Sequence, residues 1–269
     1  MSTIFYDDGL KVIHVNEGNE QSNKIPIPDI RANKPEAAYD QKEDNTVFFQ
    51  RLIKIQVDDS EFPIAAPNEI SMAFNIAKKA IEKSNELRIK VKQTGKKAKS
   101  SICDEDVTIA YDYIEEIQKA IVFSYKAVES FCNAVIPDEY IYIKTTNRGI
   151  DEHYKKEQIE RWLSTSEKVS KLLPNIMGVT SPSQKDFWSN FKNLERLRNE
   201  IIHSKSSSSI KVLKELFTPI ISDYVASSFD LLSFFIESDP SNPVFPFGFS
   251  LSSIQIKSFE NLGEMFKEA

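Results

Sequence analysis

The change in hydrophobic spacing near Pro67 constrains the fold of this 269-residue chain more than any other feature of its sequence. From Pro67 to about residue 236, apolar residues recur mostly every three or four positions, which is the spacing of helices that bury one face. The clearest stretch, Asp104–Val135, begins with carboxylates, which the helix dipole favours, and stops before Pro137. Only 7 glycines occur, which suits long helices better than a turn-rich β fold. We therefore expect a mainly α-helical protein.

Four further helices are expected after Pro67. They run from Glu69 to about Val91, from about Asp151 to Leu173, from an N-cap at Ser183 to about His203, and from about Ile210 to Ile236. Pro219 is expected to bend the last of these, because proline cannot donate the helical hydrogen bond. The aromatic side chains at helical spacing are predicted to belong to the core rather than to stack on nucleic-acid bases; they are Trp162, Trp188 and Phe191.

The two ends of the chain have a different pattern. Asp7-Asp8-Gly9 stands between two runs of β-forming residues and predicts a hairpin, and Thr46–Val57 alternates apolar and polar residues in its second half. We therefore expect a β-rich N-terminal segment over residues 1–65 and a helical domain over residues 66–238. Residues 239–269 are expected to form a tail with a short amphipathic helix, which carries Phe259, Leu262 and Phe266.

The charge balance and the absence of several sequence motifs argue against several classes of function. The formal net charge of −6 argues against a broad basic surface for nucleic acid, although a small local phosphate site needs only a few cations. The basic stretch from Lys90 to Lys99 is consistent with either a solvated linker or an arm that contacts phosphate. Cys103 and Cys132 lack the spacing of a zinc site, and neither a glycine-rich phosphate loop nor a Gly-x-Ser-x-Gly elbow is present. No metal or cofactor is expected, and with neither a signal peptide nor a membrane span visible we expect a cytoplasmic protein.

The segment from Leu194 to His203 is the one constellation that can support chemistry. Glu195, Asn199 and His203 are four residues apart, so on a helix they form one polar row that is free to face solvent or a ligand. At about 100° per residue, Arg198 lies about 140° from His203. A guanidinium can hold a phosphodiester through paired hydrogen bonds, and an imidazole can move a proton to or from a ribose oxygen. Asn199 can orient His203 or hold a phosphate oxygen.

These residues resemble the Arg-x(4–6)-His signature of the HEPN superfamily, in which a polar residue such as Asn199 commonly follows the arginine. The stretch Ala127–Asn133 is also similar to an early HEPN helix, and the resemblance spans residues 66–238. It implies a HEPN-like helical bundle and a metal-independent endoribonuclease with Arg198 and His203 as catalytic residues. It further implies a homodimer in which two motifs face one cleft, and a toxin or anti-phage defence role with a possible antitoxin or defence-system partner.

Other interpretations remain open from the sequence. A second Arg-x4-His pattern, Arg148 to His153, has glycine after the arginine and falls on an expected loop, so we interpret it as coincidence. The Arg198 row is also consistent with a solvated helix face, and Glu195 is expected either to order Arg198 or to be solvated. The bundle is alternatively a non-catalytic interaction module, which the acidic net charge favours. The N-terminal segment can also carry recognition, although it offers no binding motif.

Overall fold

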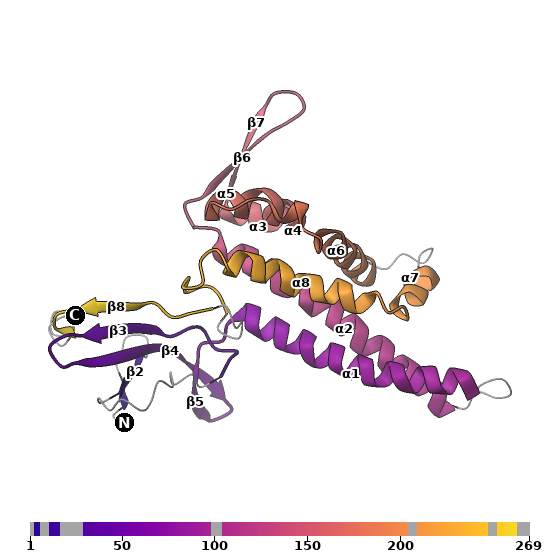
Figure 1. The fold of residues 1–269 in the computed structure, drawn as a ribbon, viewed down its shortest axis with the longest axis horizontal. Helices are drawn as coiled ribbons and strands as arrows, with labels where there is room; N and C mark the ends of the chain where they lie inside the picture. The colour runs from indigo at the N-terminus through magenta and orange to yellow at the C-terminus, as the bar shows by residue number, and fades with distance from the viewer. Residues whose placement is uncertain are drawn as a thin grey trace. The chain divides into compact units, whose positions relative to one another are not determined.

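A computed structural model describes residues 3–5, 11–16, 29–97, 104–203, 209–246 and 252–262 of the chain (Figure 1). The fold is 56% helix and 19% strand, a mixed architecture in which helices predominate, as the hydrophobic spacing predicts. The chain divides into two compact units. One comprises Met1–Ser71 with Asp239–Ala269, and the other comprises Met72–Ser238.

The first unit is built on a sheet with strand order β1-β2-β4-β3-β8, and β5 pairs with the far half of β4. The strands are β1 (Thr3–Phe5), β2 (Lys11–Asn16), β3 (Glu36–Asp40), β4 (Asn45–Val57), β5 (Ser60–Ala65) and β8 (Ile256–Phe259). β1 and β2 pair antiparallel, which confirms the predicted N-terminal pairing; the Asp7–Gly9 turn lies outside the described residues. β4 satisfies the expectation of a strand over Thr46–Val57.

The segment after Asp239, expected as a separate tail, adds a strand to this sheet. Ile256–Phe259 pairs in parallel with β3, although the sequence favoured a helix there. Phe259 and Leu262 are packed against Ala38 and Val47, so the apolar spacing serves a sheet core. The backbone pairing with β3 outweighs the local helical preference, as tertiary context commonly does in strands. The remainder of the expected helix, residues 263–269, lies outside the described residues.

Lys34 ties the C-terminal segment to the sheet unit. Its buried ammonium donates to the carbonyl oxygens of Pro240, Asn242 and Ser253 at 3.1, 2.9 and 2.9 Å. Burial lowers the pKa of Lys34 to about 8, and the charge of Asp239 opposes this effect only in part. Three carbonyl dipoles therefore replace the water that an ammonium group holds in solution.

The second unit is a set of helices around a shared core. Its helices are α1 (Glu69–Lys97), α2 (Asp104–Val135), α3 (Lys156–Trp162), α4 (Thr165–Glu167), α5 (Leu173–Met177), α6 (Trp188–Ile202), α7 (Ser209–Leu216) and α8 (Ile221–Ile236). α2, α6 and α8 pack on one another and bury Phe131, Phe191 and Phe235 completely. The rings of Phe131 and Phe235 lie 5.6 Å apart, within the range of favourable aromatic contacts.

The predicted helix boundaries are correct where strong stop signals occur. α2 has the predicted bounds, and α6 ends at the predicted residue, with His203 as its C-cap. Pro219 lies in the break between Ile210–Leu216 and α8, which meet at 76°, so the predicted bend is confirmed.

Among the residues that the structure describes, no helix alone is long and apolar enough to cross a membrane. The bent pair of Ile210–Leu216 and α8 meets the criteria of length and composition only when its two helices are joined. α1 continues to Lys97, so most of the basic stretch is helical rather than a linker.

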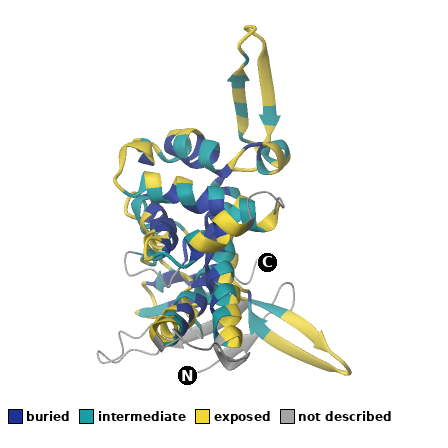
Figure 2. Ribbon diagram, turned by 90° about the vertical axis from the view of Figure 1, so that its right-hand side faces the viewer, coloured by how far each residue is buried: buried dark blue, intermediate teal, exposed yellow. Residues whose placement is uncertain are grey.

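The helix expected over Asp151–Leu173 is wrong in its first part. Strands β6 (Ile141–Thr145) and β7 (Asp151–Lys155) form an antiparallel hairpin that projects from the helices (Figures 1 and 2). Gly149 supplies the turn with a φ of 74°. The reason is local, because β-branched residues alternate over Ile141–Thr145 and precede a strong turn signal.

Two smaller expectations in this unit also fail. Trp162 is 61% exposed instead of buried, because α3 ends there and the following break turns the chain away. Ser183 does not cap α6, the helix that carries Arg198, because α6 begins at Trp188. Ser183 lies instead in a separate 3₁₀ turn, Pro182–Gln184, where its N–H donates to the hydroxyl of Ser181.

Candidate functional site

Arg198 lies near the end of α6 and is held by residues of α2. Its Nη2 donates to Oε2 of Glu129 at 3.3 Å, and its guanidinium carbon lies 5.0 Å from the centre of the Tyr125 ring. Tyr125 and Glu129 are one helical turn apart on α2, so both face the same turn of α6. The Arg198 side chain keeps 24% of its surface exposed. The guanidinium is therefore oriented by the bundle and still accessible to a ligand.

Asn199 orients Arg198 rather than His203. Its Oδ1 accepts a hydrogen bond from Nη1 of Arg198 at 3.0 Å, and its own side chain is exposed. Of the five N–H donors of a guanidinium, Asn199 and Glu129 engage one each. The other donors are those that a phosphate group can use.

His203 forms the C-cap of α6 and is exposed to solvent. Its backbone N–H donates to the carbonyl oxygen of Asn199 at 2.9 Å, and its φ and ψ of −115° and 45° leave the helix. The contacts described for this part of the chain do not join its imidazole to Arg198. One copy of the chain thus places both motif residues at the end of α6 without bringing them together.

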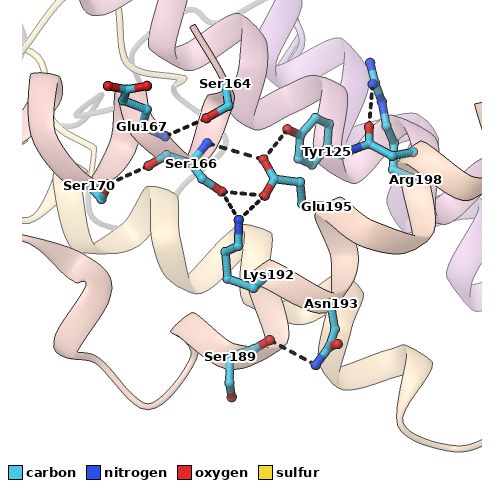
Figure 3. Close-up of polar contacts among 11 residues, drawn as sticks. Tyr125, Ser164, Ser166, Glu167, Ser170, Ser189, Lys192, Asn193, Glu195 and Arg198 are labelled. Atoms are coloured by element: carbon cyan, nitrogen blue, oxygen red, sulfur yellow. Dashed lines mark hydrogen bonds and ion pairs between the residues drawn. The ribbon is translucent and has the colours of Figure 1, made fainter. Parts of the chain in front are cut away.

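Glu195, expected to face solvent or order Arg198, is instead buried in a polar network (Figure 3). Oε1 accepts from the Tyr125 hydroxyl at 3.0 Å, Oε2 accepts from the Ser166 hydroxyl at 2.5 Å, and Lys192 pairs with the same carboxylate. Burial alone raises the pKa of Glu195, but the bonds from Lys192, Ser166 and Tyr125 outweigh it and hold that pKa below its usual value. The carboxylate is therefore charged and serves to fasten α6 to α2 and α4.

The pair of Ser166 and Lys192 has the residue types of a serine nucleophile and its base, but not the hydrogen-bond geometry. Lys192 Nζ lies 2.7 Å from Oγ of Ser166, yet the same ammonium is paired with Glu195. The Ser166 hydroxyl donates its own proton to Oε2 of Glu195 and accepts from Lys192 Nζ, so that proton is not directed at the amine. The network is thus a structural support beneath Arg198. The sequence alone gave no signal for Ser166.

A buried lysine also contacts α2, one helical turn beyond Glu129. Lys168 is 1% exposed, in the π-helical turn Lys168–Leu172, and its Nζ donates to Oδ1 of Asn133 and the carbonyl oxygen of Glu160, both at 3.0 Å. Burial lowers the pKa of Lys168, and the charge of Glu129 acts in the opposite direction. Burial also raises the pKa of the neighbouring Cys132 thiol to about 12, so that thiol is an unreactive core group.

The second Arg-x4-His pattern falls on the hairpin. Arg148 lies in its turn, and His153 is exposed on β7. No bonds from either residue to the Arg198 network are described. Across the described ranges, no three His, Cys, Asp or Glu side chains gather in a metal-binding arrangement.

Comparisons with known proteins do not assign this site. No family model matches the chain, and neither a curated protein nor a solved structure shows significant similarity to it. The geometry of the site is therefore the basis for a functional proposal.

Proposed function

We propose that this chain is a HEPN-type, metal-independent endoribonuclease that acts as a cytoplasmic homodimer in a toxin or anti-phage defence role. The observation that carries the proposal is the orientation of Arg198, which Glu129, Asn199 and the Tyr125 ring hold at the end of α6 with part of its surface exposed. A pre-oriented guanidinium loses little freedom when it binds a phosphodiester, and it stabilises charge that develops on the phosphate.

The proposed chemistry divides between the two motif residues. Arg198 binds the non-bridging oxygens of the scissile phosphate. The ribose 2′-oxygen attacks phosphorus while its proton leaves, and the bond from phosphorus to the 5′-oxygen breaks. His203 either accepts the 2′-hydroxyl proton or donates one to the leaving 5′-oxygen. Asn199 positions Arg198 by accepting the hydrogen bond from Nη1, and the products are a 2′,3′-cyclic phosphate and a free 5′-hydroxyl.

A second copy supplies what one chain lacks in this proposal. Arg198 and His203 of one helix are about 140° apart around its axis, so they do not converge on one atom. Two motifs that face each other across a two-fold axis provide an arginine and a histidine on opposite sides of one phosphate. This arrangement is the reason that the proposed enzyme is a homodimer.

The competing function is a non-catalytic interaction module. The ion pair between Arg198 and Glu129 favours it, because a phosphate must compete with a carboxylate already 3.3 Å from the guanidinium. The net charge of −6 favours it as well, since RNA approaches against a repulsive mean field.

Cleavage of a mixed RNA pool in the presence of a metal chelator tests the proposal. Arg198→Ala and His203→Ala are each expected to lose at least about 100-fold in rate, the lower range both for a group that stabilises transition-state charge and for a general acid–base group, with unchanged helical content. The chain offers a matched control: Arg148→Ala and His153→Ala remove the same residue types from the second Arg-x4-His pattern and are expected to cleave normally. No cleavage by the native chain, or equal losses in both pairs of variants, would favour the interaction module.

A further inference from the structure

The β6–β7 hairpin has one packed face and one open face. On the packed face, the rings of Tyr142 and Tyr154 lie 6.3 Å apart, and Tyr142 Oη and Lys144 Nζ donate to Glu167 at 3.3 and 3.0 Å. On the open face, Ile141 and Ile143 are 52% and 54% exposed. Figure 2 shows the hairpin projecting from the helices, mostly in the exposed colour. A two-stranded ribbon of this kind is at best marginally stable without further cover.

The backbone of β6 has an unpaired edge as well as this open face. The N–H of Thr146 donates to the carbonyl oxygen of Ile150 at 2.8 Å, which closes the hairpin. Because bonded pairs alternate along an antiparallel ladder, Ile141, Ile143 and Thr145 direct their N–H and C=O groups away from β7. In the part of the chain that the structure describes, no other strand pairs with this edge. A row of unpaired backbone groups is a template for another strand.

The two edges of the hairpin differ in how well they resist pairing. β7 has charges at Asp151, Glu152 and Lys155, and charged side chains are the usual means of protecting an edge. β6, with the sequence Ile-Tyr-Ile-Lys-Thr, has one charge and is otherwise rich in β-forming residues. The open edge is therefore β6.

We infer that β6 pairs antiparallel with β6 of a second copy, on a two-fold axis through Ile143. This register overlaps the whole strand and is self-complementary. Ile143 faces Ile143 of the partner subunit, and Lys144 faces Tyr142 of the partner subunit instead of another lysine. The two isoleucines of each copy then form one apolar stripe on a four-stranded sheet. Taken alone, a two-fold contact of this kind closes on itself as a dimer.

The inference rests on the strand geometry and not on the proposed ribonuclease activity. Two strands of five residues bury less than the roughly 1,200 Å² at which stable interfaces begin, so we expect concentration-dependent dimerisation. Sedimentation velocity on the full chain over a concentration series measures it directly. The expected result is a monomer–dimer equilibrium for the native chain.

Two variants decide whether β6 forms the contact. Ile143→Lys places like charges face to face on the axis and is expected to weaken dimerisation at least about tenfold, since like charges directly opposite are unfavourable. His153→Lys adds the same residue on the same face and at the paired position of β7, so it is expected to dimerise as the native chain does. A native chain that stays monomeric, or an Ile143→Lys variant that dimerises normally, would overturn the inference.

Disulfide trapping tests the register even where Ile143→Lys disturbs the hairpin. In a Cys103→Ser background, Ile143→Cys brings two thiols together on the axis at the roughly 5.5 Å Cα separation of a bonded pair, which suits a disulfide. Mild oxidation with diamide is expected to yield a covalent dimer. Ile141→Cys faces Thr145 of the partner subunit and is expected to stay monomeric under the same oxidation. Equal crosslinking of the two variants, or none with Ile143→Cys, would rule out this register.

Discussion

Replacing Glu195 by alanine tests whether the network beneath Arg198 supports the fold. Glu195 is 8% exposed and its carboxylate has three partners, which lose different amounts of free energy when it is removed. Tyr125 is 3% exposed and keeps its hydrogen bond with Thr165, but its O–H loses its acceptor away from water, at a cost of about 1–3 kcal/mol. Lys192 is 46% exposed and regains water, so its share is at most about 1 kcal/mol. We expect Glu195→Ala to lower the free energy of unfolding by about 1–4 kcal/mol.

Urea denaturation followed by circular dichroism measures this loss of stability. A double-mutant cycle with Tyr125→Phe isolates the free energy of the hydrogen bond between Glu195 and Tyr125. Phenylalanine at position 125 needs no partner, so the second substitution should recover part of the cost. The pH dependence of the stability is a second, independent test of this contribution. The pKa of Glu195 is depressed in the folded state, so its contribution is present above the unfolded value of about 4.3 and is lost as pH falls through the folded pKa. Glu195→Ala with native stability at neutral pH would refute the structural role of the network.

Two further substitutions test each unit of the fold separately. Phe131→Ala removes a fully buried ring that contacts Phe235 and is expected to cost about 3–5 kcal/mol, which urea denaturation monitored on the helical signal will show; a loss below about 1 kcal/mol would contradict the described core. Lys34 has a folded pKa of about 8, below its unfolded value of about 10.4, so between these values the unfolded chain binds the extra proton and stability rises with pH. The difference in stability between the native chain and Lys34→Met should therefore increase from pH 8 to 10, and a flat difference would count against the buried ammonium.

Helix boundaries followed from the sequence where one local signal was strong. The acidic start of α2 and Pro137 after its end set both limits, and Pro219 marked the break before α8. These effects act within one or two turns of the chain, so they need no knowledge of tertiary contacts. The hairpin β6–β7 was also encoded locally, by the alternation over Ile141–Thr145 and the turn at Gly149, although the helical interpretation of the following residues obscured it.

The surroundings of Arg198 did not follow from the sequence, because they depend on distant residues. Helical spacing placed Glu195 in a polar row with Asn199, and nothing local indicated that it is buried. Its partners Tyr125 and Ser166 lie 70 and 29 positions away, and only the packing of α2 and α4 against α6 brings them together. Spacing predicts which residues share a helix face; burial of that face is decided by its neighbours.

The strand β8 shows the same limit at the level of the fold. Ile256–Phe259 has apolar spacing that is compatible with a helix, but pairing with β3, more than 200 positions earlier, makes it a strand. Lys34 is a polar residue that a sequence argument places on the surface, and the carbonyl groups of the C-terminal segment make its burial possible.

The most direct measurement of the central claim is cleavage of an end-labelled RNA by the native chain, side by side with Arg198→Ala, in the presence of a chelator. The proposed chemistry predicts native products that end in a 2′,3′-cyclic phosphate and at least about a 100-fold slower reaction for the variant, which lacks the group that stabilises charge on the phosphate. It also predicts no cleavage of the same sequence with a 2′-deoxyribose at the scissile position. An Arg198→Ala variant that cleaves as fast as the native chain, or a 2′-deoxy substrate that is cut equally well, would contradict the assignment of Arg198 and His203.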